Sequence, residues 1–303
     1  MNRIILSLII VFVSLSSHAG DSVVARVNGV DISSRALEVA VNALIPRSTY
    51  HGSISEEKRN EFRKKALEDL IAKELQYQDA VARGMKPAKK QVKARMKEIR
   101  KRFKSKKAYT AAMKQAGITQ DELRESVARE VLIQQAIEET VTEQAQMTDT
   151  ALREYYQNNT AKFRQPESVR LRMISTKNQE KAQRILAQVK EGKDFANLAA
   201  RESEDNYRIK GGDIGYIHKG RVFPELEDAA FVLKPGETSG LVKAQGTWFI
   251  IKVEDKRPEH QLSFNEARDK LKKELEDKRA AELMEKWISD LRAKAKIEIL
   301  MKK

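Results

Sequence analysis

A long amphipathic segment near the C-terminus limits how this chain can fold. Ser263 and Glu266 have the spacing of a capping box, which predicts a helix that starts there and reaches about Ala295. Its large apolar residues recur at helical spacing: Leu271, Leu275, Leu283, Trp287, Ile288 and Leu291. Such a face must be buried against another element. Residues 258–303, in which a strand at Ile297–Leu300 could follow the helix, therefore need a partner elsewhere in the chain.

The best partner is the region 20–165, where helical signals dominate. Val23–Val27 and Val30–Ile32 flank Asn28-Gly29, a pair typical of a type I′ hairpin turn. Apolar spacing and capping residues then predict helices at 35–44, 55–83, 87–103, just before Gly117, 119–141 and 148–156. Residues 20–165 are thus predicted to form a helical domain.

The pattern changes at Pro166. The following residues predict a strand at 169–175, helices at 179–191, 195–201 and 224–231, a glycine-rich turn at 211–215, and strands at 240–242 and 248–253. Residues 166–257 therefore read as a compact α+β unit. We expect an α+β protein in which residues 20–165 and 258–303 form one discontinuous helical domain with this unit inserted.

The first nineteen residues have the features of a signal peptide. Arg3 precedes an apolar run from Ile4 to Leu15. The small residues Ser17 and Ala19 then occupy the positions that a signal peptidase recognises before its cleavage site. The run is too short for a bilayer core of about 30 Å, although a retained membrane anchor is the alternative. No cysteine follows for lipid attachment. We expect the mature chain to lie outside the cytoplasm, most simply in a bacterial periplasm.

The composition excludes several kinds of functional site. The chain has no cysteine and only four histidines. It therefore has no disulfide, no thiolate zinc site and no cysteine nucleophile, and few residues for a histidine-rich metal cluster. We expect no metal and no cofactor.

The positive charge is concentrated in one stretch. The chain carries +14, and Arg83–Lys107 alone holds thirteen Lys or Arg against one acid, Glu98, a net +12. Such a stretch is either a solvated helix face or a site for anionic lipid headgroups, lipopolysaccharide or acidic client chains. Nucleic acid is not an expected partner of an exported chain.

Five ordered blocks in the α+β unit carry a family resemblance. They are Lys190–Ala199, Ser203–Asp205, Gly211–Gly215, Phe231–Gly240 and Trp248–Val253. In order and spacing they resemble the parvulin domain of peptidyl-prolyl isomerases. With the flanking helical regions, the chain looks like the SurA-like, PpiD-like and PrsA-like extracytoplasmic foldase-chaperones.

The resemblance implies rotation about X-Pro bonds, with site residues carried over by position. The family's two histidines and its Cys or Asp correspond here to Met173, Phe249 and Asp205. A proline slot would be completed by Val222, Leu226 and Phe231. Both histidines are therefore missing. The site is either a weak isomerase with Asp205 as its polar group, or a degenerate peptide-binding module.

Each candidate residue also has a structural interpretation. The apolar residues are core candidates, and Asp205 could equally cap a turn. Asp213 is expected to fix the glycine turn, and His218 is expected to be solvated.

The sequence thus predicts a periplasmic peptidyl-prolyl isomerase and chaperone for unfolded or proline-containing clients, including exported or outer-membrane proteins. One alternative is a non-enzymatic periplasmic chaperone or assembly factor with a degenerate parvulin domain. Another is a structural module that holds the envelope surface through its basic stretch. An apolar groove in the helical domain would favour a chaperone.

Overall fold

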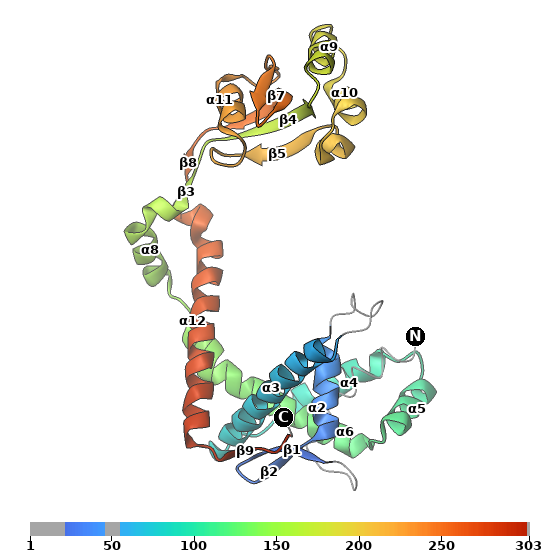
Figure 1. The fold of residues 1–303 in the computed structure, drawn as a ribbon. Coiled ribbons are helices and arrows are strands. Elements are labelled where there is room, and N and C mark those ends of the chain that lie inside the picture. Colours follow the sequence, from blue (N-terminus) through green and yellow to red (C-terminus); the bar gives the residue numbers. More distant parts are fainter. Residues whose placement is uncertain (1–21, 46–54, 302–303) are drawn as a thin grey trace. The chain divides into compact units, whose positions relative to one another are not determined.

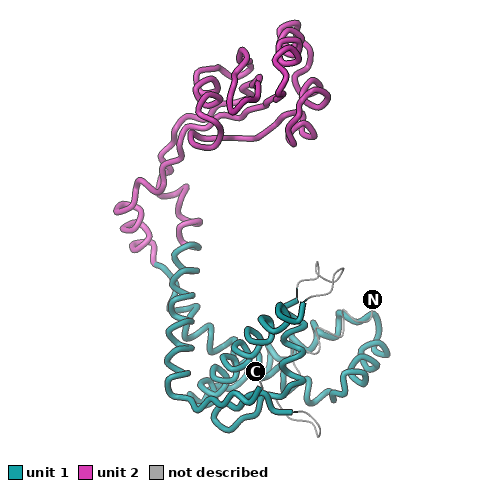
Figure 2. The backbone as a smooth tube through the Cα atoms, in the orientation of Figure 1, with its two compact units in different colours: residues 1–147, 273–303 teal, residues 148–272 magenta. Residues whose placement is uncertain are grey.

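The structure, a computed structural model, describes residues 22–45 and 55–301 (Figure 1). The predicted signal peptide, Met1–Ala19, lies outside these residues. The chain divides into two compact units, which are described separately below (Figure 2). Unit 1 comprises residues up to 147 together with 273–303, and unit 2 comprises 148–272.

Unit 1 contains a small sheet that joins the two ends of the described chain. Strands β1 (Val23–Val27) and β2 (Val30–Ser33) form the predicted hairpin, in which Asn28 and Gly29 have φ values of 50° and 85°. Strand β9 (Ile297–Ile299) pairs antiparallel with the other edge of β1. The strand order is β2-β1-β9.

The rest of unit 1 is helical. Its helices are α2 (Ser34–Leu44), α3 (Glu56–Ala82), α4 (Lys89–Lys101), α5 (Lys106–Ala116), α6 (Gln120–Ile137) and α7 (Glu143–Ala145), with a π-helical turn, η2 (Glu138–Thr142), before α7. Ser33 caps α2, and a capping box of Thr119 and Glu122 begins α6. Helix α4 starts two residues later than the sequence predicts, because Ala88 has an extended backbone.

Helix α12 (Phe264–Lys294) has its C-terminal part in unit 1. Trp287 is buried in a cluster with Ala80 of α3 and with Leu132 and Ala136 of α6. Leu291 packs against the cluster formed by β1, β2, α2 and α3. The apolar face of this segment is therefore covered by the N-terminal helices.

Unit 2 is built on a four-stranded antiparallel sheet in the order β5-β4-β7-β6. The strands are β4 (Ser168–Thr176), β5 (Asp213–Ile217), β6 (Val242–Ala244) and β7 (Thr247–Arg257). Helices α9 (Gln179–Lys190) and α10 (Phe195–Glu202) pack with Ile174 and Ile250, whereas α11 (Pro224–Val232) packs with Leu171 and Ile251. The sheet therefore has an apolar cluster on each face.

The glycine-rich turn is shorter than the sequence predicts, because β5 already begins at Asp213. Before it, residues 206–210 form the 3-10 helix η4 (Asn206–Lys210). Gly212 has a φ of 79°, and a Cβ added there would lie 2.4 Å from the carbonyl oxygen of Met173. Glycine at position 212 thus permits the close approach of this turn to β4.

Unit 2 extends beyond the predicted insert at both ends. It also includes α8 (Asp149–Asn158), the 3-10 helix η3 (Thr160–Phe163), the paired short strands β3 (Arg164–Gln165) and β8 (His260–Gln261), and the start of α12. The ring of Tyr156 lies 4.8 Å from that of Phe163 and 5.9 Å from that of Phe264, and its hydroxyl donates to the carbonyl of Leu262 at 2.5 Å. These contacts hold α8 to the beginning of α12.

No helix within residues 22–45 and 55–301 is both long and apolar enough to cross a membrane.

Candidate functional site

Met173 and Phe249, which stand at the two positions where the family has histidines, lie on one face of the unit 2 sheet. In the β4–β7 pairing, Met173 lies opposite Ile251 and Ser175 lies opposite Phe249. Residues opposite each other, and residues two apart on one strand, share a face of a sheet. Met173, Ser175 and Phe249 therefore point to the same side.

Helix α11 and the loop before it complete an apolar cluster on this face. Leu226 and Phe249 are buried within it, and Met173, Val222 and Phe231 pack against it while remaining partly exposed. All five apolar residues predicted from the sequence are thus brought together. Leu226 and Phe249 form the interior of the cluster, and the other three form its accessible part.

Phe223 is a candidate that the sequence interpretation missed. Its side chain is 42% exposed, and its ring centroid lies 6.3 Å from that of Phe249. A large aromatic directly before the helix-opening Pro224 was the available signal. An exposed ring beside a partly open apolar cluster suits contact with an extended peptide.

Glu227 fixes the loop that carries Val222. One carboxylate oxygen, Oε1, accepts hydrogen bonds from the backbone amides of Gly220, Arg221 and Val222 at 2.6, 2.9 and 3.3 Å. The position of the Val222 side chain therefore depends on this carboxylate. Composition and spacing do not reveal such a role, because it arises from loop geometry.

Asp205 is held in a network of hydrogen bonds. Its Oδ2 accepts from the hydroxyls of Ser175 and Ser203 at 2.7 and 2.6 Å, and its Oδ1 accepts from the backbone amide of Tyr207 at 2.7 Å. The carboxylate therefore caps η4 and at the same time binds β4 next to the apolar cluster. Its serine partners are buried and were not predicted from the sequence.

Asp213 and His218 have the structural positions expected of them. Asp213 accepts from Arg170 at 2.6 Å and from the backbone amide of Gly215 at 2.9 Å, and the hydrogen bond from Arg170 is the main cause of its lowered pKa. His218 is exposed, with Nδ1 2.9 Å from the carbonyl oxygen of its neighbour Lys219. Asp213 thus stabilises the glycine turn.

The arrangement suits binding more than bond-breaking chemistry. The accessible part of the cluster is apolar, and the carboxylates of Glu227 and Asp205 each already accept three hydrogen bonds. Within the residues that the structure describes, no group of three or more His, Asp or Glu side chains is placed to hold a metal ion.

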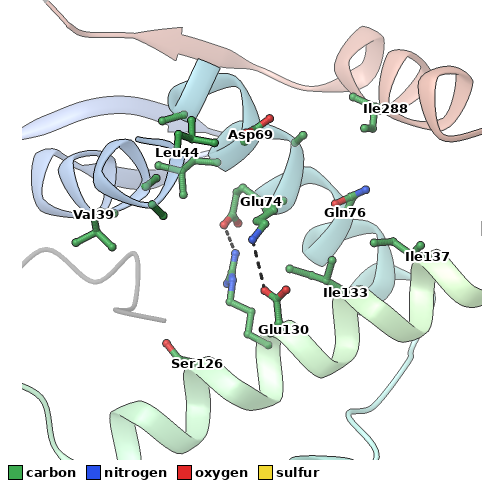
Figure 3. A pocket seen from close by; sticks show the side chains of 18 of the residues that line it. Val39, Leu44, Asp69, Glu74, Gln76, Ser126, Glu130, Ile133, Ile137 and Ile288 are labelled. Atoms are coloured by element: carbon green, nitrogen blue, oxygen red, sulfur yellow. Dashed lines mark hydrogen bonds and ion pairs between the residues drawn. The ribbon is translucent and has the colours of Figure 1, made fainter. Parts of the chain in front are cut away.

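Unit 1 contains a second candidate site, a pocket of about 450 Å³ between α2, α3, α6 and α12 (Figure 3). Val39, Leu44, Ile133, Ile137 and Ile288 are among the apolar side chains that line it. Small alanines of α2 and α3 complete this lining. The pocket is therefore largely aliphatic.

An ion-paired group lies in the same pocket. Glu74 is only 1% exposed and accepts a hydrogen bond from Arg129, whose guanidinium lies 3.6 Å from the ring centroid of Tyr77. Lys73 and Glu130 form a second, longer pair at 3.8 Å (Figure 3). These two pairs neutralise four of the charged side chains in the pocket, and Asp69 also lines it.

Comparison with known proteins also divides the chain into two parts. Residues 147–269 match the PPIC-type PPIASE domain, and residues 1–137 match the SurA-like N-terminal domain. The foldase protein PrsA 3 of Bacillus cereus is 32% identical over 218 residues, which cover 70% of this chain and 69% of that protein. The foldase protein PrsA of a Geobacillus strain is 29% identical over 258 residues, 83% of this chain and 86% of that protein.

A solved structure from a study of SurA-like chaperones of Campylobacter jejuni also matches. It is 20% identical and covers 93% of this chain and 100% of that chain, with a TM-score of 0.39. A score this low does not establish that the whole chains superpose, so the relationship rests on the sequence matches.

Proposed function

Because this chain belongs to the family of parvulin-type peptidyl-prolyl isomerases that includes the PrsA foldases, we propose that it isomerises X-Pro bonds in unfolded exported polypeptides and binds these clients through its helical unit. The chain is a peptidyl-prolyl cis-trans isomerase by family. Its client class, its location and the roles of its site residues are the parts proposed here.

The observation that carries the proposed mechanism is the partly open apolar cluster between α11 and the β4–β7 strands. Rotation about an X-Pro bond breaks no covalent bond but crosses a barrier of about 18–20 kcal/mol, because the twisted amide loses resonance. A catalyst lowers this barrier by binding the twisted form better than either planar form. We assign the proline ring to the accessible part of the cluster, at Met173, Val222 and Phe231.

Asp205 acts in this proposal as a positioning residue. Its carboxylate ties Ser175 of β4 to the start of η4, and Ser175 lies opposite Phe249. Since both family histidine positions carry apolar side chains, catalysis depends mainly on apolar binding of the proline. We therefore expect the rate of proline isomerisation to be low.

The helical unit supplies the proposed chaperone function. Its aliphatic pocket, with Val39 and Ile288 in the wall, offers a place for apolar segments of an unfolded chain. An apolar pocket in this unit favours a chaperone over a purely structural module. Exported or outer-membrane proteins are the proposed clients, and the signal-like sequence Met1–Ala19 supports a periplasmic location.

A specific observation favours a second function, a chaperone or assembly factor whose parvulin domain only binds peptides. Phe249 is buried in the core of the cluster, and Asp205 already accepts three hydrogen bonds from the fold itself. An isomerisation assay and an aggregation assay on the same full-length preparation separate the two functions. Accelerated X-Pro exchange supports the isomerase, whereas client protection with no acceleration supports the alternative.

A further inference from the structure

The cationic surface, defined as the thirteen Lys and Arg residues of 83–107, has few partners within the protein. The structure places all thirteen at exposed positions. Arg83 pairs with Asp79 and Glu139, and Lys101 pairs with Glu98. The other eleven have no acidic partner among the residues that the structure describes. The charge of this surface is therefore not neutralised from within.

Seven of these thirteen cations lie in α4, and three of them form a row along it. Val92 and Ile99 are buried in the cluster formed by α4, α5 and α6, which fixes the inward face of the helix. Lys90, Lys93 and Lys97 recur at spacings of three and four, so their side chains lie in a row. Like charges at this spacing destabilise a helix. The row is therefore unfavourable for α4 itself.

The N-termini of α4 and α5 also carry charges that are unfavourable for a helix. Each begins with two lysines, Lys89-Lys90 and Lys106-Lys107, and neither has an acid in its first turn. Helices α3, α6, α8 and α9 of the same chain all have acids there. Cations at a helix N-terminus oppose its dipole. Binding of an external anion would account for these lysines, which do not stabilise the helices that carry them.

We propose that the cationic surface docks the protein on the surface of an anionic phospholipid bilayer. Nine of its thirteen cations are lysines, which are compact hydrated charges suited to a diffuse anionic surface. The aromatics of this region, Phe103 and Tyr109, are buried, so the surface lacks the stacking platforms that single-stranded nucleic acids use.

The docking is electrostatic and does not involve insertion into the bilayer. Residues 83–107 are all described by the structure, and none of the large apolar side chains among them is exposed. Such binding is reversible and weakens with salt, because the screening length is about 10 Å at 0.1 M and about 3 Å at 1 M. The role is independent of proline isomerisation.

The test measures co-sedimentation of the full-length chain with vesicles of phosphatidylcholine, with and without phosphatidylglycerol. The test variant carries Lys90→Gln, Lys93→Gln and Lys97→Gln. The matched control carries Lys273→Gln, Lys278→Gln and Lys286→Gln, which remove the same charge from lysines that each face an acid four residues on. Circular dichroism checks that both variants keep their helical content.

We expect binding only to vesicles containing phosphatidylglycerol. Each lysine near such a surface contributes about fivefold in affinity, so the test variant should bind roughly 100-fold more weakly. The control should bind as the wild type does, within about twofold. Equal loss in the control, or equal binding to phosphatidylcholine alone, would overturn the proposal. So would tighter binding to single-stranded DNA or polyglutamate that depends on the same three lysines.

Discussion

The hydroxyl of Ser175 donates a hydrogen bond of 2.7 Å to Oδ2 of Asp205, and so connects strand β4 to the turn before η4. Ser203 donates to the same oxygen at 2.6 Å and accepts at 3.0 Å from the backbone amide of Ser175. The polar group at the parvulin position thus supports the strand that carries Met173. Its effect on isomerisation is expected to be transmitted through the geometry of the sheet.

Asp205→Ala tests this role. The change removes the cap of η4 and leaves two buried serine hydroxyls without their acceptor, which should cost about 2 to 3 kcal/mol of unfolding free energy. Isomerase activity should fall more than in His218→Ala, since the ring of His218 is exposed and lies beside the carbonyl oxygen of Lys219. Urea denaturation and X-Pro exchange rates measure the two effects. Equal effects of the two substitutions would contradict the assignment.

A second prediction concerns how the chain's ends fold together. We propose that the N-terminal helices and the C-terminal part of α12 form one cooperative domain. Trp287 packs with Ala80 and Leu132, so Trp287→Ala should destabilise unit 1 by about 3 to 5 kcal/mol. Lys286→Ala, at an exposed position, should change stability by less than about 0.5 kcal/mol.

Thermal unfolding followed by circular dichroism measures both variants. If α12 were an independent arm, loss of Trp287 would leave the main helical transition unchanged. That outcome would remove the discontinuous-domain proposal.

The start of α12 gives a pH prediction. Glu266 accepts hydrogen bonds from the hydroxyl and backbone amide of Ser263, and lies 3.2 Å from Nε2 of His260. These contacts lower the pKa of Glu266 from 4.5 to about 2, with the Ser263 hydroxyl as the largest cause. A lowered carboxylate pKa stabilises the fold fully above pH 4.5, and this contribution disappears as the pH falls towards 2.

Glu266→Gln should therefore be less stable than the wild type at neutral pH, and the two should converge between pH 4.5 and 2. Glu274→Gln, an exposed change on the same helix, serves as the control and should show no such convergence. Urea denaturation at several pH values provides the measurement. A stability difference that is the same at every pH would show that the charge of Glu266 is not responsible.

The unit 1 pocket gives a prediction about client binding. Val39→Ser removes an apolar group from the pocket wall, whereas Val81→Ser makes the same change at a 50% exposed position outside it. Full burial of a valine side chain is worth about 1.5 to 3 kcal/mol, and Val39 is already half-buried in the free protein. Val39→Ser should therefore weaken binding of an unfolded polypeptide by about three- to tenfold. Val81→Ser should have little effect. Fluorescence anisotropy with a labelled, permanently unfolded client measures both, and equal affinities would exclude the pocket.

Local signals in the sequence were sufficient for most of the fold. The Asn28-Gly29 turn and the caps at Ser33 and Thr119 each depend on short-range chemistry that the residues themselves display. Strands β4 and β7 were predicted from their composition, whereas β5 was interpreted as part of the glycine-rich turn. The strand at 297–299 was predicted as a possibility. Its partner, β1, could not be read from the sequence, because pairing across more than 250 residues leaves no local pattern.

The candidate site was only partly predictable for the same reason. The resemblance supplied Met173, Asp205 and Phe249, and the proline slot that it implies supplied Val222, Leu226 and Phe231. The roles of Ser175 and Glu227 arise from contacts that form only after β4 and the 218–222 loop are in place. The outer limits of unit 2 depend similarly on the ring contacts of Tyr156.

The most direct test of the account is the rate of cis-trans exchange of an X-Pro tetrapeptide, measured by NMR exchange spectroscopy with the full-length chain. We expect measurable acceleration, slower than that of a parvulin that retains both histidines. Val222→Asp places a charge in the proposed proline slot and should lower the rate by roughly tenfold or more. Val232→Asp, on the same unit at a 79% exposed position, should leave it unchanged. A full rate in Val222→Asp, or an equal loss in Val232→Asp, would contradict the assignment of proline binding to this cluster.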